Sequence, residues 1–220
     1  MTNILNRPAA SEPAGTTPAD TTPAEVAHRT VAPLRRWYAV MLVGGLLGVF
    51  TAAWQTVERI AYAADPDSLS VCEINALLSC SSVFDHWQSS ALGVPNSIIG
   101  LPVFAFIAAA GLAGVLGSRL SRGYLGSVLG VTLFMTGFVF WYMEQSAFDI
   151  GVLCLFCVGC LVNIVIAGIG ITRVAAAEHV LGHGRADREL RLLVASRADL
   201  IAWVGLAAIV GAMLYVGLAY

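Results

Sequence analysis

Five long apolar runs dominate the pattern of the chain, and polar segments of unequal length separate them. Each run comes close to the ~20 apolar residues that a helix needs to cross a bilayer. The runs cover residues 38–57, 97–117, 123–143, 151–171 and 199–220. The pattern therefore predicts an all-α integral membrane protein with five transmembrane helices.

The polar segments set the expected domain organisation. The N-terminal segment is rich in Pro, Thr and Ala and lacks apolar periodicity, so we expect it to be disordered. No apolar stretch of a signal peptide follows Met1. We expect a tail (1–34), a four-span core (35–173) with a long loop (58–96), a connector (174–198) that is amphipathic enough to lie on the membrane, and a fifth transmembrane helix (199–220).

Composition supports a lipid environment. Hydrophobic residues make up 58% of the chain and charged residues 12%, whereas soluble domains are about half apolar and about a quarter charged. This apolar excess is too large for one buried core. The net charge of -2 gives no reason to expect binding to nucleic acid.

Arginine is distributed very unevenly. Eleven of the twelve basic residues lie in the tail, in the turn around Arg119 and in the segment from Arg173 to Arg197, which all fall on one side of the membrane. Only Arg59 lies in the loops on the other side. By the positive-inside rule the tail is cytoplasmic. The loops that hold two cysteine pairs then face the opposite, oxidising compartment, in which disulfides form and persist.

Cys154 and Cys157 form a Cys-x-x-Cys pair at the start of the fourth run, after an expected tight loop over residues 144–150. Three residues apart on a helix, the two side chains share one face. Unpaired N–H groups and the helix dipole favour a thiolate there, and such pairs cycle between dithiol and disulfide. Their apolar neighbours place the pair at the lipid boundary, within reach of a lipid-soluble oxidant.

Cys72 and Cys80 form the second pair, in the long loop. Ile74, Leu77, Leu78 and Val83 recur at helical spacing, so we expect a short helix on the membrane. The rise over eight helical residues is about 12 Å, whereas bridged Cα atoms lie ~5.5 Å apart. A disulfide would therefore need local unwinding. We hypothesise that electrons pass from one pair to the other.

Other uses of these cysteines stay open. Two pairs could bind a structural zinc ion, although seven residues between Cys72 and Cys80 exceed the usual spacing of two to four. They could also form two static disulfides. Haem attachment is disfavoured because Val158 rather than His follows Cys157. Cys160 is interpreted as a small packing residue.

Several short motifs occur in a specific order on this topology. They are Cys72 and Cys80 with seven residues between them, Cys80-Ser-Ser-Val-Phe84-Asp-His-Trp87, Pro95-Asn96-Ser97-Ile-Ile-Gly100 and Cys154-Leu-Phe-Cys157. Over about residues 35–173 the chain resembles the vitamin K epoxide reductase family, and in particular its bacterial disulfide-forming members. The resemblance implies a four-helix bundle around a quinone, here with a fifth helix.

The resemblance also implies roles for the cysteines. Cys157 matches the thiol that reacts with the quinone, and Cys154 matches the one that exchanges with the loop. Cys80 matches the shuttle cysteine that attacks Cys154, and Cys72 the one that faces the protein substrate. The implied activity is reoxidation of a DsbA-like thioredoxin-fold protein with transfer of electrons to a quinone, menaquinone or ubiquinone, in a bacterial inner membrane.

Two further residues match cofactor contacts. Asn96 matches an asparagine that donates a hydrogen bond to a quinone carbonyl, and its alternative role is an ordinary helix N-cap before Ser97. Phe84 matches an aromatic side chain that covers the ring, and its alternative role is core packing. No metal is expected.

The chain departs from the family pattern at some positions. Leu161 stands where animal members carry Tyr, which weakens any case for epoxide chemistry. A serine expected near Asp85 and His86 is absent, and we interpret both residues as solvated. Many bacterial members continue into a thioredoxin-like domain after the fifth span, whereas this chain ends at Tyr220, so we expect a separate electron donor.

Two rival functions remain at this point. A DsbB-like quinone oxidoreductase also uses four spans and two cysteine pairs, but it usually carries the Cys-x-x-Cys in the earlier loop. A membrane metal-binding or transport protein would need polar groups inside the spans, and the spans offer few.

Overall fold

The structure is a computed structural model that describes residues 23–66, 72–73 and 78–219, with side chains described from residue 34 to residue 218 of these ranges. Its elements are helices, which confirms the predicted all-α class. They are α1 (Pro23–Ala64), α2 (Cys80–Phe84), the 3-10 helix η1 (Trp87–Ser90), α3 (Asn96–Val115), α4 (Arg122–Gln145), the π-helical turn η2 (Ser146–Ile150), α5 (Leu155–Ala177), α6 (Arg185–Ala195) and α7 (Ala198–Ala219).

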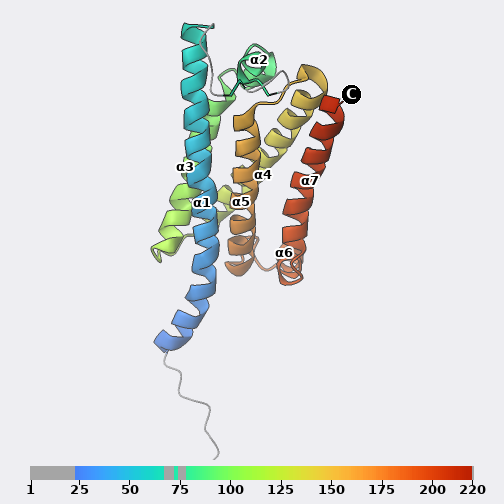
Figure 1. Cartoon of the computed structure of the whole chain (residues 1–220). Coiled ribbons are helices and arrows are strands. Elements are labelled where there is room, and N and C mark those ends of the chain that lie inside the picture. The colour runs from blue at the N-terminus through green and yellow to red at the C-terminus, as the bar shows by residue number, and fades with distance from the viewer. Residues whose placement is uncertain (1–22, 67–71, 74–77, 220) are drawn as a thin grey trace, which may run out of the picture.

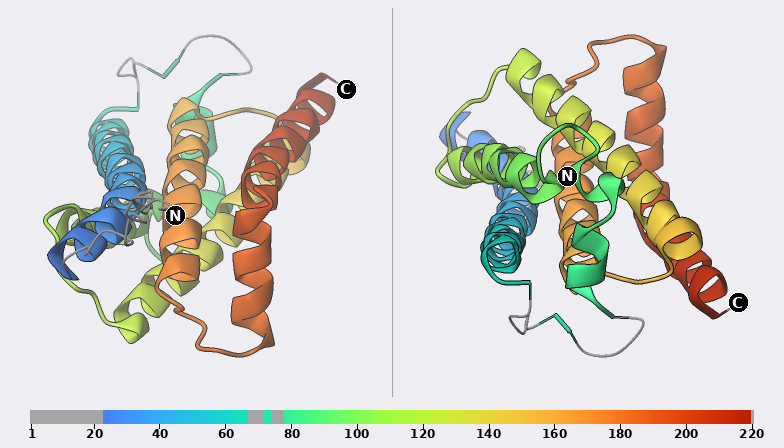
Figure 2. Two further views of the ribbon diagram at one scale, coloured as in Figure 1. Left: turned by 90° about the horizontal axis from the view of Figure 1, so that it is seen from below. Right: turned by 90° about the horizontal axis from the view of Figure 1, so that it is seen from above.

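Helices α1, α3, α4, α5 and α7 are long and apolar enough to cross a bilayer, as the five apolar runs predict. Figure 1 shows them running between two ends of the molecule, with α2 at one end and α6 at the other. Viewed along the bundle, α5 lies in the middle, with α1 on one side and α7 on the other (Figure 2). Because α5 also packs on α4, residues at its start reach several neighbouring helices.

Consecutive glycines let α1 approach two helices closely. A Cβ atom at Gly44 would lie 2.6 Å from the backbone nitrogen of Ala167 on α5, and one at Gly45 would lie 2.6 Å from that of Ala108 on α3. Small residues allow such backbone contact between transmembrane helices, where van der Waals packing replaces the hydrophobic effect. The α1 backbone is thereby fixed between α3 and α5.

A buried ion pair ties α7 to α5. Arg173 donates to the two carboxylate oxygens of Asp199 over 2.6 and 2.9 Å, and the Arg173 guanidinium lies 4.2 Å from the ring centre of Trp37 on α1. One helical turn further along α7, the Trp203 indole donates to Thr172 over 3.1 Å. These contacts attach the fifth helix to the four-span core.

Three expected boundaries differ from the structure. Helix α1 begins at Pro23, so residues 23–34 of the expected disordered tail are helical, and residues 1–22 lie outside the described part. Residues 144–150 are not a tight loop, because α4 runs to Gln145 and continues as η2. Gly151, at a left-handed φ of 75°, ends this helix, and α5 begins four residues after the expected start.

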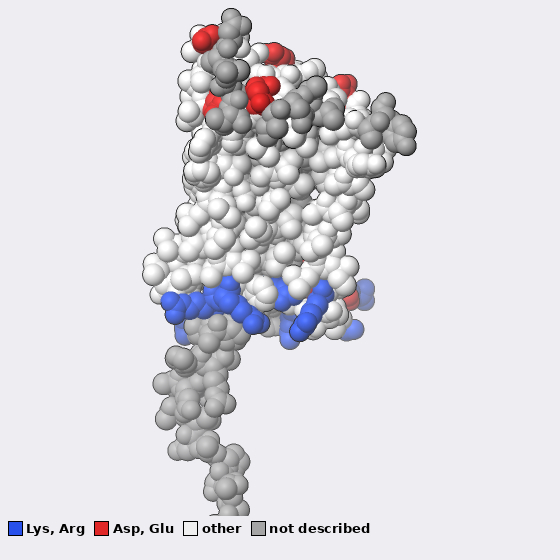
Figure 3. All heavy atoms as spheres, in the orientation of Figure 1, with Lys and Arg blue, Asp and Glu red and all other residues white. Residues whose placement is uncertain are grey.

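Charge separates the two ends of the bundle. Figure 3 shows the arginines as a belt at one end and the visible carboxylates mostly at the other. We call these the arginine end and the cysteine end, because α2 and the start of α5, which carry Cys80 and Cys154, lie at the latter.

Candidate functional site

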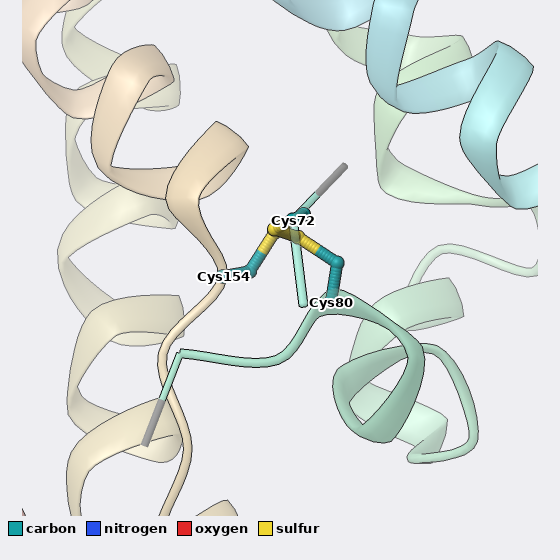
Figure 4. Close-up of side chains that lie close together, drawn as sticks. All are labelled: Cys72, Cys80 and Cys154. Atoms are coloured by element: carbon teal, nitrogen blue, oxygen red, sulfur yellow. A yellow bond between two sulfur atoms is a disulfide. The ribbon is translucent and has the colours of Figure 1, made fainter. Parts of the chain in front are cut away.

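Three cysteine sulfurs meet at the cysteine end (Figure 4). Cys72 and Cys80 form a disulfide with Cα atoms 5.6 Å apart, and the Cys154 sulfur lies 3.1 Å from the Cys80 sulfur. All three residues are fully buried. We call the Cys72–Cys80 bond the loop disulfide and Cys154 with Cys157 the CxxC pair.

The loop disulfide does not unwind a helix in the part of the chain that the structure describes. Cys80 is the first residue of α2, and Cys72 lies outside any helix. Of the short helix expected in this loop, the described residues show only α2. Ile74 and Leu77, on which that prediction also rested, lie outside the described residues.

Backbone pairing holds the loop beside the CxxC pair. Leu78 and Leu153 form an isolated parallel β-bridge, in which the Ser79 N–H donates to the Leu153 carbonyl over 3.2 Å. The Ser79 hydroxyl then accepts from the N–H of Ser82 and caps α2. Cys80 and Cys154 each follow one of the paired residues closely, so this contact sets their separation.

Glu73 stabilises the start of α2 from across the loop. Its carboxylate accepts hydrogen bonds from the Ser81 N–H over 2.9 Å, the Ser81 hydroxyl over 2.7 Å and the Ser79 hydroxyl over 3.2 Å. Burial raises the pKa of Glu73, but these hydrogen bonds together bring that pKa below its ordinary value. A negative charge therefore lies near enough to Cys154 to raise the pKa of its thiol, and sequence reasoning missed this carboxylate.

Cys154 and Cys157 are free thiols at the start of α5. Cys154 occupies the N-cap and Cys157 lies in the first turn, so the pair straddles the helix start instead of lying wholly within it. The hydrogen bond with the Cys157 thiol lowers the pKa of Cys154 most, burial raises it, and the N–H groups of Cys157 and Phe156 lower it further. The net effect is a pKa below the ordinary cysteine value.

Gln55 reaches the CxxC pair from α1. Its side-chain nitrogen lies 3.5 Å from the Cys157 sulfur and 3.8 Å from the Cys154 sulfur, and the residue is buried. The amide can donate a hydrogen bond to either sulfur. The sequence contained one signal for this residue, a polar amide within an apolar span, and such residues are frequently functional.

A pocket opens next to the CxxC pair between α1, α3, α4 and α5. It contains about 800 Å³ of empty space when the open solvent at its mouth is included. Cys157 and Cys160 line this pocket, whereas Cys154 does not. Cys160 is therefore a wall residue of the pocket in addition to packing in the bundle.

The two predicted cofactor contacts line the same pocket. Asn96 donates from its side chain to the Gln88 carbonyl over 2.8 Å, and its own carbonyl oxygen is buried without a hydrogen-bond partner. The N-cap of α3 is Pro95, and Asn96 makes no capping hydrogen bond, so the capping alternative is wrong. Phe84 is 5% exposed and belongs both to the pocket wall and to the core.

The remaining predicted positions lie around this centre. Leu161 is buried and is not among the residues that line the pocket. Asp85 accepts a hydrogen bond from the Tyr62 hydroxyl over 2.8 Å, and His86 precedes η1 as its N-cap. Both of these residues are exposed, as predicted.

The arrangement of the cysteine sulfurs tests the alternative that they bind a metal ion. The sulfurs of Cys72, Cys80 and Cys154 lie within 4.8 Å of one another. Zinc is bound by thiolates, and two of these three sulfurs are joined in the loop disulfide. In this state the three cysteines are therefore unsuited to hold a zinc ion. The CxxC pair consists of two free thiols, whereas the alternative of two static disulfides requires a bond between them.

Comparison with known proteins agrees with this arrangement. The profile of the Vitamin K epoxide reductase family matches residues 39–172, which include every cysteine of the site. A search of curated proteins finds no match. The family match spans more than half of the chain and covers α3, α4 and most of α1 and α5. The chain therefore belongs to the vitamin K epoxide reductase family, whose members are membrane thiol–disulfide oxidoreductases.

Proposed function

We propose that this protein oxidises the thiols of a partner protein and passes two electrons through its two cysteine pairs to a membrane quinone. One observation carries the proposal. The two sulfurs of the CxxC pair have different neighbours, because Cys154 lies 3.1 Å from Cys80 of the loop disulfide whereas Cys157 lines the pocket. The pair thus connects the loop disulfide to the pocket.

The relay consists of thiol–disulfide exchanges. A partner thiolate attacks Cys72 and releases Cys80, and the second partner thiol then displaces Cys72, so the partner leaves as a disulfide. The Cys80 thiolate attacks Cys154 while Cys154 is bonded to Cys157, which releases the Cys157 thiolate. Cys72 then attacks Cys80, restores the loop disulfide and releases Cys154 as a thiolate. The lowered pKa of Cys154 makes it a good leaving group in this last exchange.

The state of the cysteines in the structure corresponds to the end of that sequence. The loop disulfide is formed, and both CxxC thiols are free. Cys72 is fully buried in this state, so it must become exposed before a partner can attack it. Gln55 can donate to a negative charge on either CxxC sulfur, which stabilises the Cys157 and Cys154 thiolates that the last two exchanges release.

The pocket residues fit a quinone. A bound quinone supplies the acceptor for the two electrons and two protons. The buried, unpaired Asn96 carbonyl oxygen can accept a hydrogen bond from a ring hydroxyl, and the second N–H of the same amide can donate to a ring carbonyl. Phe84 and the apolar walls from α3 and α4 exclude water from the ring. Cys157 lines the pocket, so its thiol is the one that a quinone bound there would meet.

We infer the location and the partner from charge and chemistry. The positive-inside rule assigns the arginine belt to the cytoplasm, and this supports a location of the cysteine end on the outer face of a bacterial cell membrane. A DsbA-like thioredoxin-fold protein, whose paired cysteines carry two electrons, is the partner class that this relay suits.

Quinone reduction by purified protein tests the proposal. A reduced thioredoxin-fold protein serves as the electron donor, and the wild type is compared with Cys80→Ser and Cys157→Ser. Both variants should lose donor-driven turnover, while Cys80→Ser should still turn over with a small dithiol that reduces the CxxC pair directly. Wild-type turnover in Cys157→Ser would contradict the assignment of Cys157 to the quinone.

A further inference from the structure

A second pocket lies at the arginine end, far from the cysteines, where α1, the end of α5 and α6 meet. It contains about 1,560 Å³ of empty space including its opening. Leu34 and Trp37 of α1 line one wall, and Arg188 and Arg191 of α6 line another. The relay described above does not use any of these residues.

The charge of this pocket is positive. Three arginines, Arg173, Arg188 and Arg191, line it against one carboxylate, that of Glu178. Asp199 already neutralises Arg173. Arg188 and Arg191 are exposed and form no ion pair with any residue that the structure describes. Because they are three residues apart on α6, they face the same way.

The pocket also has an apolar side. Leu34, Trp37, Leu192 and Val194 line it together with small alanines. Leu192 is 52% exposed and the adjacent Leu193 is 48% exposed, so α6 presents apolar side chains outward at the end of the molecule where the arginines form a belt (Figure 3). An amphipathic helix in this position lies in the headgroup region.

We propose that this pocket binds the headgroup of an anionic phospholipid. The lipid phosphate accepts hydrogen bonds from the guanidinium groups of Arg188 and Arg191, which suit phosphate oxygens because of their planar donor geometry. The glycerol backbone and the first acyl carbons lie against Leu192 and Val194. A soluble anion would share only the phosphate contacts, so the apolar wall favours a lipid.

Lipid binding by the full-length protein tests this proposal. The protein is purified in a neutral detergent, and binding of phosphatidylglycerol and of phosphatidylcholine is measured by native mass spectrometry and by thermal unfolding. The test variant is Arg188→Gln/Arg191→Gln. The matched control is Arg119→Gln/Arg122→Gln, which removes the same charge from exposed positions at the same end but outside the pocket.

We expect wild type and the control to bind phosphatidylglycerol in preference to phosphatidylcholine, and the test variant to bind phosphatidylglycerol on the order of 30-fold more weakly. Arg188→Lys/Arg191→Lys, which keeps the charge, should retain part of the affinity. Equal losses in the test and control variants would overturn the proposal in favour of a general attraction by the arginine belt. Displacement of the lipid by inorganic phosphate at matched concentration would overturn it in favour of a soluble anion.

Discussion

The side-chain amide of Gln55 lies 3.5 Å from the Cys157 sulfur and 3.8 Å from the Cys154 sulfur. A single donor therefore serves both ends of the CxxC pair, and it comes from α1, whose backbone is fixed by Gly44 and Gly45 against α5 and α3. In the proposed relay, negative charge moves between the two sulfurs, and this amide stabilises it at either position.

Gln55→Leu should slow quinone reduction about 10- to 100-fold, because a hydrogen bond to a charged group contributes about 1.5–3 kcal/mol. Reduction of the loop disulfide by a partner should change little. Stopped-flow measurement of both half-reactions separates the two effects. Thr56→Val is the control, since Thr56 is the next residue on α1 and its hydroxyl donates to the Ala52 carbonyl of the same helix. Equal rates in Gln55→Leu and the control would contradict this role.

The charge of Glu73 should shift the titration of Cys154. The Glu73 carboxylate raises the pKa of Cys154, whereas the Cys157 thiol and the N–H groups at the start of α5 lower it. Glu73→Gln removes the negative charge, so more of Cys154 is thiolate at a given pH. The midpoint of the pH dependence of Cys154 alkylation, followed by peptide mass spectrometry on reduced protein, should move to lower pH.

Glu58→Gln is the matched control for that experiment, because it removes a carboxylate from the same end, where Glu58 accepts a hydrogen bond from the Trp54 indole over 3.0 Å. An unchanged or higher midpoint in Glu73→Gln would show that the carboxylate acts on Cys154 only through the hydrogen bonds that it makes to Ser79 and Ser81.

Asn96→Leu should raise the KM for quinone about tenfold, because it removes one neutral hydrogen bond worth about 1–1.5 kcal/mol. Donor-driven reduction of the loop disulfide in the same variant is the internal control and should be unaffected. A fall in kcat with an unchanged KM would indicate that Asn96 supports the Gln88 segment, to which it donates, and does not contact the quinone.

Gly45→Val should destabilise the bundle, because its Cβ would lie 2.6 Å from the backbone nitrogen of Ala108 and backbone cannot move aside cheaply. The expected cost is about 1–3 kcal/mol, visible as a lower midpoint of thermal unfolding in detergent. Gly130→Val on α4 is the control, since a Cβ there meets nothing within 4 Å. Equal midpoints in the two variants would refute tight contact between α1 and α3.

The sequence predicted the five membrane helices well, because an apolar run of bilayer length is a strong and local signal. Helix boundaries differ from the prediction where the chain leaves the membrane. The left-handed Gly151 ends η2, and residues that look like a loop by composition continue α4 as helix. The start of α1 at Pro23 likewise has no apolar signal.

The family resemblance predicted which cysteines exchange, but the sequence did not show the contacts that bring them together. Nothing in the local sequence indicates that Leu78 pairs with Leu153 and so brings Cys80 to Cys154. Glu73 and Gln55 act on sulfurs that are distant in sequence or buried on another helix, and only the packing of α1 and α2 against α5 reveals them. Long-range contacts of this kind depend on tertiary structure.

The most direct test of the relay is disulfide mapping of the Cys72→Ser/Cys157→Ser double variant, which leaves Cys80, Cys154 and Cys160. Mild oxidation followed by non-reducing peptide mass spectrometry identifies the bond that forms. The separation of 3.1 Å between the Cys80 and Cys154 sulfurs predicts a Cys80–Cys154 disulfide as the main product. A Cys154–Cys160 bond in its place, or free Cys80 and Cys154, would contradict the transfer of electrons between the two pairs.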